Sequence, residues 1–178
     1  KYFVESFLTG FAKPEDFEEF VKHLHQVKTA HYTAMLREGL IPLRPGIRQL
    51  ITDARDGAIR LAIATTTSPE NVAALLEVGL GKNWQKYFDS VGCGDIVPHK
   101  KPAPDIYNWV LNELKLAPQD CIALEDSSNG LRSALAAGIK TYVTTNPYTH
   151  RQDFTDAAGI FDDLSDLQAF YRATGLNL

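Results

Sequence analysis

From Gly46 onward, short apolar segments alternate with segments whose apolar residues recur at helical spacing. The segments expected to form strands are 60–64, 90–92, 121–125, 140–143 and 158–161. The segments expected to form helices are 47–55, 69–78, 104–114, 128–137 and 164–171. Short apolar strands that alternate with helices are typical of a parallel sheet covered by helices on both faces. We therefore predict an α/β fold for this part of the chain.

The segment that precedes this part has a helical pattern. Apolar side chains recur every three or four residues between Phe17 and Met35, so residues 14–38 are predicted to form one amphipathic helix. Apolar residues between positions 2 and 8 indicate a further helix that begins before the first residue given. Two prolines within residues 41–46 break any helix there, and we interpret this stretch as a linker.

The linker predicts two domains, a partial helical domain over residues 1–42 and the α/β domain over residues 43–178. A net charge of −4 argues against a nucleic-acid binder that relies on a basic surface. No apolar run approaches the roughly 20 residues that span a bilayer, which excludes a transmembrane protein. Two cysteines are too few for a disulfide scaffold and fit a reducing, cytoplasmic setting. We expect a monomer that binds neither nucleic acid nor membrane.

Polar residues follow three of the predicted strands, and ligands of parallel sheets bind beyond the carboxyl ends of the strands. Thr65 and Thr66 follow the first strand, where hydroxyls and free backbone N–H groups suit a phosphate, although such residues also cap helices. Glu125 and Asp126 end the third strand. Two adjacent carboxylates repel each other unless a cation such as Mg²⁺ neutralises them, although Asp126 alone would serve as a helix cap.

A lysine and two prolines form the third polar cluster, which follows the second strand. The prolines hold Lys101 in an extended conformation just before a helix, so its ammonium group can fix a phosphate as a point charge. The alternative is a solvated loop lysine, which is how we interpret the neighbouring Lys100. On the long N-terminal helix, Lys28 interrupts the apolar stripe. It either extends its ammonium group into solvent or faces a cleft and an anionic ligand.

In this order, a Thr after a strand, a Lys-Pro-x-Pro-Asp segment and a Glu-Asp-Ser segment resemble the second, third and fourth motifs of haloacid dehalogenase-type phosphatases. The resemblance is strongest to the CbbY-like branch, which neighbours β-phosphoglucomutase. It rests on the segments LRPGIRQLI, IATTTSPENV, KKPAPDIY and ALEDSSNGLRSALAAG. It implies a Rossmann-like parallel sheet with a mobile helical cap, of which the first 42 residues would be part.

The resemblance also implies a role for each matching residue. The Thr65 hydroxyl and the Thr66 backbone N–H would bind the transferring phosphoryl group, and Lys101 would pair with it. Asp126 would be a Mg²⁺ ligand, with Glu125 as a second ligand directly or through water. Lys28 would reach a second anionic group of the substrate from the cap.

The first motif of this family, Asp-x-Asp-Gly-Thr, is absent from the 178 residues. Its first Asp is the nucleophile and its second Asp is the general acid and base. The strand before this motif is central in the family's sheet, between the strands that end at Ala64 and Glu125. Without that strand, two apolar strand edges would face an empty slot. We therefore expect these residues to be the C-terminal part of a longer enzyme.

The function implied for the intact protein is a Mg²⁺-dependent phosphatase that acts on a small-molecule sugar phosphate. Within the CbbY-like branch, the implied substrate is a sugar bisphosphate such as xylulose 1,5-bisphosphate. One alternative is a phosphosugar mutase, which returns the phosphoryl group to a sugar instead of to water. The other is a non-catalytic protein that binds an anion or a metal and has lost the first motif.

Overall fold

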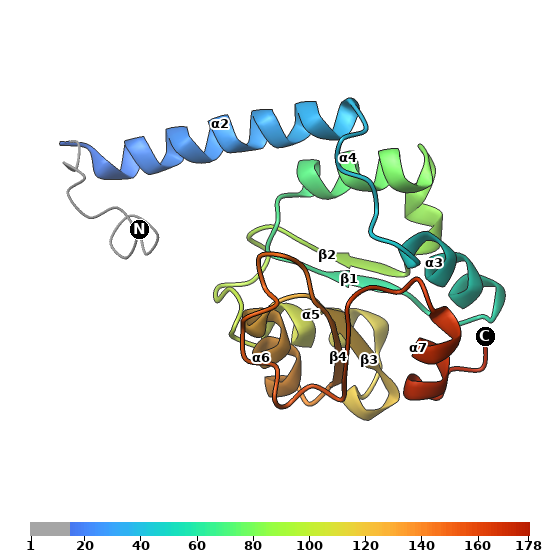
Figure 1. The fold of residues 1–178 in the computed structure, drawn as a ribbon. Helices are drawn as coiled ribbons and strands as arrows, with labels where there is room; N and C mark the ends of the chain where they lie inside the picture. The colour runs from blue at the N-terminus through green and yellow to red at the C-terminus, as the bar shows by residue number, and fades with distance from the viewer. Residues whose placement is uncertain (1–14) are drawn as a thin grey trace. The chain divides into compact units, whose positions relative to one another are not determined.

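The computed structural model describes residues 15–178 (Figure 1). The helix predicted near residues 2–8 lies outside this part. The chain divides into two compact units, Lys1–Ile41 and Pro42–Leu178, and each is described by itself. The described part of the first unit is dominated by helix α2, Phe17–Arg37, as the periodicity predicts. The helix begins after Asp16, because the Asp16 carboxylate accepts a hydrogen bond from the Glu19 backbone N–H at 2.9 Å.

The second unit alternates strands and helices, which confirms the predicted α/β fold. Its strands are β1 (Ala62–Ala64), β2 (Ser90–Gly92), β3 (Ile122–Glu125), β4 (Lys140–Thr144) and β5 (Gly159–Phe161). Its α-helices are α3 (Ile47–Asp56), α4 (Pro69–Leu80), α5 (Asp105–Leu114), α6 (Ser128–Ala136) and α7 (Leu167–Thr174). Two short 3₁₀ helices, at Trp84–Tyr87 and Pro118–Asp120, were not expected from the sequence.

The last helix begins later than the predicted residues 164–171. The Asp166 carboxylate accepts a hydrogen bond from the Ala169 backbone N–H at 2.9 Å, so the helix begins at Leu167. Leu164, which the prediction placed in this helix, is buried in the loop before it. A capping side chain therefore fixed the helix start more strongly than the apolar pattern did.

The strands form two separate parallel groups, which Figure 1 shows as two sets of arrows. In one group β1 pairs with β2, with Ile63 opposite Val91. In the other the order is β3-β4-β5, with Leu124 opposite Tyr142 in the first pair. Among the described residues, β1 and β3 do not pair with each other. The parallel sheet is therefore interrupted between them.

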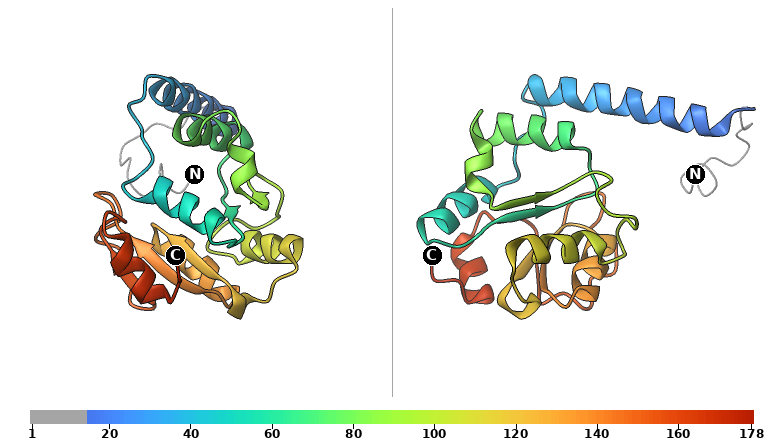
Figure 2. Two further views of the ribbon diagram at one scale, coloured as in Figure 1. Left: turned by 90° about the vertical axis from the view of Figure 1, so that its right-hand side faces the viewer. Right: turned by 180° about the vertical axis from the view of Figure 1, so that it is seen from behind.

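Helices cover both faces of the three-stranded group. Tyr142 of β4 packs with Phe170 and Tyr171 of α7, whereas its neighbour Val143 packs with Leu131 of α6. Successive side chains of a strand point to opposite faces, so α6 and α7 lie on opposite sides of this group. Figure 2 shows the same arrangement from two further directions.

The start of the second unit is anchored to the ends of β4 and β5 by one arginine. Arg44 Nη1 donates to the Thr144 carbonyl and hydroxyl oxygens at 3.1 and 2.8 Å. Arg44 Nη2 donates to the Thr145 carbonyl and, at 2.8 Å, to the Asp162 carbonyl. Gly46 then adopts a φ of +78°, and a Cβ there would overlap the Leu164 carbonyl oxygen. The interpretation of this stretch as a linker omitted these fixed contacts.

Candidate active site

The carboxyl ends of β1 and β3 meet at one lysine, although the two strands do not pair. Lys101 Nζ donates to the carbonyl oxygen of Ala64, the last residue of β1, at 2.9 Å. It also donates to Oε1 of Glu125, the last residue of β3, at 2.5 Å. The side chains of Lys101 and Glu125 are only 15% and 9% exposed. The predicted phosphate-binding lysine is therefore a largely buried ion-pair partner, and the interpretation as a solvated loop residue is wrong.

Tyr107 is a residue of this site that the sequence reasoning missed. It lies in the first turn of α5, and its hydroxyl donates to Glu125 Oε1. Burial and the Glu125 carboxylate raise the pKa of Tyr107 well above its ordinary value, so its phenol remains a donor. Lys101 Nζ lies 4.8 Å from the centre of the Tyr107 ring. A buried tyrosine needs a hydrogen-bond partner for its hydroxyl. This requirement was the one available indication in the sequence that Tyr107 could belong to a polar site.

The Glu125 carboxylate lies directly against helix α6. A Cβ at Gly130 would overlap the carboxylate, so the position requires glycine. Ser127 caps α6, because its hydroxyl accepts a hydrogen bond from the Gly130 N–H at 3.2 Å. The alternative interpretation of Asp126 as the cap is therefore wrong. Asp126 is exposed, and its Oδ2 accepts a hydrogen bond from Asn146 Nδ2 at 3.4 Å.

Thr65 and Thr66 follow β1 at the same end of the sheet. The Thr65 N–H donates to the Gly92 carbonyl at 2.8 Å and extends the pairing of β1 with β2. The Thr65 hydroxyl accepts a hydrogen bond from the Thr67 N–H at 3.2 Å. Ser68 stands at the N-cap position of α4 but makes no capping hydrogen bond with its side chain. The threonines therefore form a turn beside Lys101, and neither of them caps the helix.

The structure brings five of the six predicted site residues together. One cavity is lined by all of these residues, namely Thr65, Thr66, Lys101, Glu125 and Asp126. The sixth predicted residue, Lys28, belongs to the first unit, where it is an exposed residue of α2. Lys100 forms an exposed ion pair with Asp95 at 2.7 Å, as expected for a solvated lysine.

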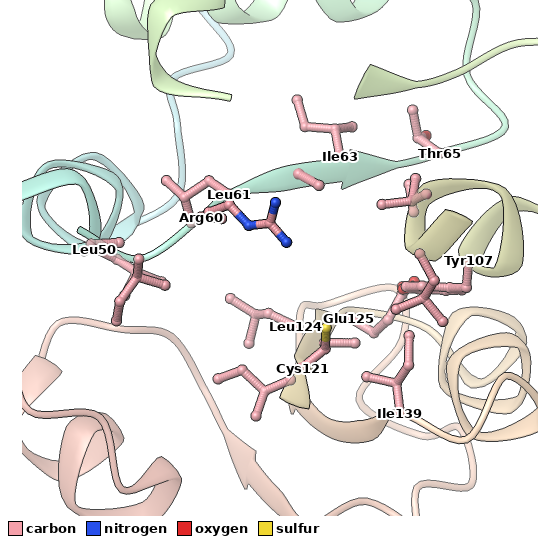
Figure 3. Close-up of a pocket in the computed structure, with 18 of the residues that line it drawn as sticks. Leu50, Arg60, Leu61, Ile63, Thr65, Tyr107, Cys121, Leu124, Glu125 and Ile139 are labelled. Carbon is pink, nitrogen blue, oxygen red and sulfur yellow. The ribbon is translucent and has the colours of Figure 1, made fainter. Parts of the chain in front are cut away.

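This cavity has a volume of about 900 Å³ and lies between β1 and β3 (Figure 3). Ile63 of β1 and Leu124 of β3 line it from its two sides, and Tyr107 and Glu125 lie toward the end where Thr65 is found. Most of the remaining lining is aliphatic. The empty slot expected between the strands that end at Ala64 and Glu125 is therefore present.

The Glu125 and Asp126 carboxylates can provide some of the ligands that Mg²⁺ needs. In residues 15–178, no three His, Cys, Asp or Glu side chains lie together so that they could hold a metal ion. Mg²⁺ commonly uses only one or two carboxylates, together with waters and substrate phosphate. Asp126 is exposed, and Glu125 Oε2 is not used by Lys101 or Tyr107. This pair can therefore supply part of a magnesium site.

No helix in the described part of the chain is both long and apolar enough to cross a membrane. Comparisons with known proteins agree with the resemblance found in the sequence. The protein CbbY of Cereibacter sphaeroides is 44% identical over 147 residues, which are 83% of this chain and 64% of that protein. The chain therefore spans less than two thirds of this relative.

Two solved structures show the same fold. A mutant of CbbY from Rhodobacter sphaeroides, in complex with xylulose-(1,5)bisphosphate, has a TM-score of 0.78 and 44% identity, and the match covers 83% of this chain and 65% of that one. A β-phosphoglucomutase from Clostridium difficile shares the fold at 19% identity, with a TM-score of 0.71 over 97% of this chain and 73% of that one. A model of the haloacid dehalogenase-like hydrolases matches residues 2–138. The chain therefore belongs to the haloacid dehalogenase-like hydrolase family.

Proposed function

We propose that the intact protein is a phosphatase that hydrolyses a phosphomonoester of a small sugar. The observation that carries this proposal is the position of Lys101, whose Nζ joins the ends of β1 and β3. Through this contact, the threonine turn, the lysine segment and the carboxylate pair meet at the carboxyl ends of the strands. The proposed nucleophile is an aspartate outside the 178 residues, because the first motif is absent from them.

The residues of this chain would bind and orient the phosphoryl group. The Thr65 hydroxyl and the Thr66 backbone N–H supply neutral donors, and Lys101 supplies a positive charge. Such preorganised donors stabilise the charge that develops on the phosphoryl oxygens during in-line transfer. Tyr107 and Ala64 hold the site in place before substrate binds, because they fix the Glu125 carboxylate and the Lys101 ammonium group.

The proposed cofactor is Mg²⁺, held by Asp126 and by Glu125 directly or through water. When bound, it would neutralise negative charge on the phosphoryl oxygens. The Glu125 carboxylate is already neutralised by its ion pair with Lys101. Asp126, which accepts one hydrogen bond from Asn146, is therefore the more available ligand. This assignment predicts that Asp126→Asn weakens magnesium binding more than the neighbouring Asn129→Ala does.

The proposed substrate is a sugar bisphosphate such as xylulose 1,5-bisphosphate. The solved CbbY relative that binds this compound supports the choice, since it is 44% identical. Lys28 on α2 is the proposed contact to the second phosphate, and residues 1–42 the proposed cap domain. The proposed compartment is the cytoplasm, which agrees with the free thiols of Cys93 and Cys121.

The test is phosphate release from xylulose 1,5-bisphosphate by the intact protein, with Mg²⁺ and after its removal by a chelator. We expect turnover only with the metal. We expect Thr65→Ala to lower kcat about a hundredfold, as loss of one transition-state donor does. Thr67→Ala is the matched control, because Thr67 is exposed and lies outside the cavity lining. Equal kcat values for the two variants, or turnover unaffected by the chelator, would contradict the proposal.

A further inference from the structure

The loop that follows β4 contains a half-buried asparagine, Asn146, that is held in place by several hydrogen bonds. Asn146 Oδ1 accepts hydrogen bonds from the Tyr148 N–H at 2.9 Å and from the Thr149 N–H at 3.2 Å. The Asn146 carbonyl accepts from the Thr149 and His150 N–H groups at 3.0 and 2.9 Å. The Asn146 N–H donates to Thr149 Oγ1 at 3.3 Å. These bonds fix both the backbone and the side chain of Asn146 in a single turn.

The sheet fixes the start of this loop. The Thr145 N–H donates to the last carbonyl of β5 at 2.8 Å and extends the pairing of β4 with β5. Arg44 Nη2 donates to the Thr145 carbonyl, directly before Asn146. Because β3 and β4 are parallel, with Glu125 opposite Val143, the carboxyl end of β4 lies beside that of β3. Asn146 therefore stands next to the carboxylate pair at a position that the sheet determines.

The Asn146 side chain connects this turn to Asp126. Two backbone donors use Oδ1, so Nδ2 is the atom that donates to Asp126 Oδ2, at 3.4 Å. An ionised carboxylate only accepts hydrogen bonds and an amide nitrogen only donates them, so this orientation of the amide satisfies both contacts. A carboxylate at position 146 could accept the two N–H groups of the turn, but it would place a second negative charge beside Asp126. The position therefore suits an amide, which carries an acceptor and a donor together.

The same loop also contacts the backbone that follows Asp126. Gln152 Oε1 accepts a hydrogen bond from the Ser128 N–H at 2.7 Å. The Gln152 N–H donates to the Thr149 carbonyl at 2.8 Å, so this contact is tied to the turn of Asn146. Within residues 15–178, Asp126 Oδ1 accepts no hydrogen bond. The loop thus holds one oxygen of the carboxylate and leaves the other available to a metal ion.

We infer that Asn146 is a positioning residue for Asp126, which it orients for Mg²⁺. The inference deepens the proposed function, on which it rests for the assignment of Asp126 as a magnesium ligand. Asp126 is exposed, so without this contact its carboxylate would rotate and would lose conformational entropy on binding the ion. Carboxylates that bind metal ions are themselves hydrogen-bonded by neighbouring groups, and these neighbours strengthen metal binding. Asn146 supplies such a bond before the ion arrives.

The test is the affinity of the intact protein for Mg²⁺ alone, measured by isothermal titration calorimetry. Asn146→Ser keeps an oxygen that can accept the N–H groups of the turn, but it removes the donor to Asp126. We expect this variant to bind Mg²⁺ about tenfold more weakly, as loss of a hydrogen bond to a metal ligand does. Asn129→Ala is the matched control, because the Asn129 side chain accepts a hydrogen bond from Arg132 and does not contact Asp126. It is expected to leave the affinity unchanged.

A second variant separates positioning of Asp126 from stability of the loop. Thr149→Val removes the hydroxyl that accepts from the Asn146 N–H, but it keeps the Asn146 amide that donates to Asp126. We expect it to bind Mg²⁺ as the wild type does. Turnover by Asn146→Ser is expected to approach that of the wild type as the Mg²⁺ concentration rises, because mass action then fills the weakened site. A merely structural role would lower turnover at every Mg²⁺ concentration.

Three results would overturn the inference. They are equal Mg²⁺ affinity of the wild type and Asn146→Ser, an equal loss of affinity in Thr149→Val, and a loss of turnover that excess Mg²⁺ does not reverse. Weaker Mg²⁺ binding by Asn146→Ser, in a protein that releases no phosphate from sugar phosphates, would contradict only the proposed function. Magnesium-dependent phosphate release with equal Mg²⁺ affinity in the two proteins would contradict only this inference. A wild-type protein that binds no Mg²⁺ would contradict both.

Discussion

Lys101 and Glu125 form an ion pair that is almost excluded from solvent, with side chains 15% and 9% exposed. Removing one member of such a pair leaves an uncompensated charge, which costs more than the pair itself contributes. Tyr107 donates a further hydrogen bond to the same carboxylate oxygen, and this bond would remain after loss of the lysine. A substitution at Lys101 is therefore partly buffered by its neighbour.

We predict that Lys101→Met lowers the free energy of unfolding by about 3 kcal/mol, because Glu125 is left buried without its counter-charge. Urea unfolding of the 178-residue chain measures this loss. Lys100→Met is the control, since its ion pair with Asp95 is exposed and exposed pairs contribute less than about 1 kcal/mol. A loss of the same size in both variants would show that burial of the pair is not the cause.

Among single residues, the polar ones that follow strands could be predicted from the sequence, because parallel sheets bind ligands at the ends of their strands. Thr65, Lys101 and Glu125 were found in this way and line one cavity. Tyr107 was not predicted, because it lies on a helix and its role depends on a contact with Glu125, 18 positions away. Contacts of this kind depend on packing, which residue spacing does not encode.

Among the elements, the strands were predicted closely and helix ends less well. The strand at residues 90–92 matches β2, and the others shift by one or two residues at their ends. Apolar runs indicate such strands because helices cover both faces of a parallel sheet. Helix ends depend on single capping side chains, such as Asp166 at α7, which compete with the apolar pattern.

The turn before α3 provides a test of element packing. Gly46 and Gly175 share a φ of +78°, but a Cβ at Gly46 would overlap the Leu164 carbonyl, and nothing lies within 4 Å of a Cβ at Gly175. In both alanine variants, the left-handed backbone conformation lowers the free energy of unfolding by about 1–2 kcal/mol. Gly46→Ala adds the overlap, so we predict a further loss of at least about 2 kcal/mol in thermal or urea unfolding. Equal losses would show that the turn can move away from Leu164.

For the whole molecule, the sequence predicted the α/β class and the interrupted sheet, the latter through the family resemblance. Lys28 is a residue whose role the sequence alone does not determine. Its place on the apolar stripe of α2 follows from helical geometry, but its distance from the slot depends on how the two units are arranged. The role of Lys28 therefore remains a prediction.

The pH dependence of stability is a property of the whole molecule that two tyrosines influence. Burial and a carboxylate neighbour raise the pKa values of Tyr107, beside Glu125, and of Tyr171, beside Asp53, above the ordinary 10.0. The folded phenols keep their protons where the unfolded ones lose them. Their contribution is therefore complete below about pH 10 and declines as the pH rises above that value.

We predict that the free energy of unfolding falls more steeply above about pH 10 in the wild-type chain than in Tyr107→Phe or Tyr171→Phe. Urea unfolding at a series of alkaline pH values measures the slopes. Ultraviolet titration of the folded chain gives an independent readout, since each variant should retain the absorbance change of the tyrosines that ionise near their ordinary pKa. Identical slopes in all three proteins would contradict the assignment.

With the sheet interrupted between β1 and β3, helix α5 joins the two strand groups. Ile106 and Leu111 of α5 pack in one buried cluster with Ala123 of β3, and Ala64 of β1 packs against the same cluster. This side-chain packing and the contacts of Lys101 with Ala64 and Glu125 connect the two groups, in place of backbone hydrogen bonds between β1 and β3.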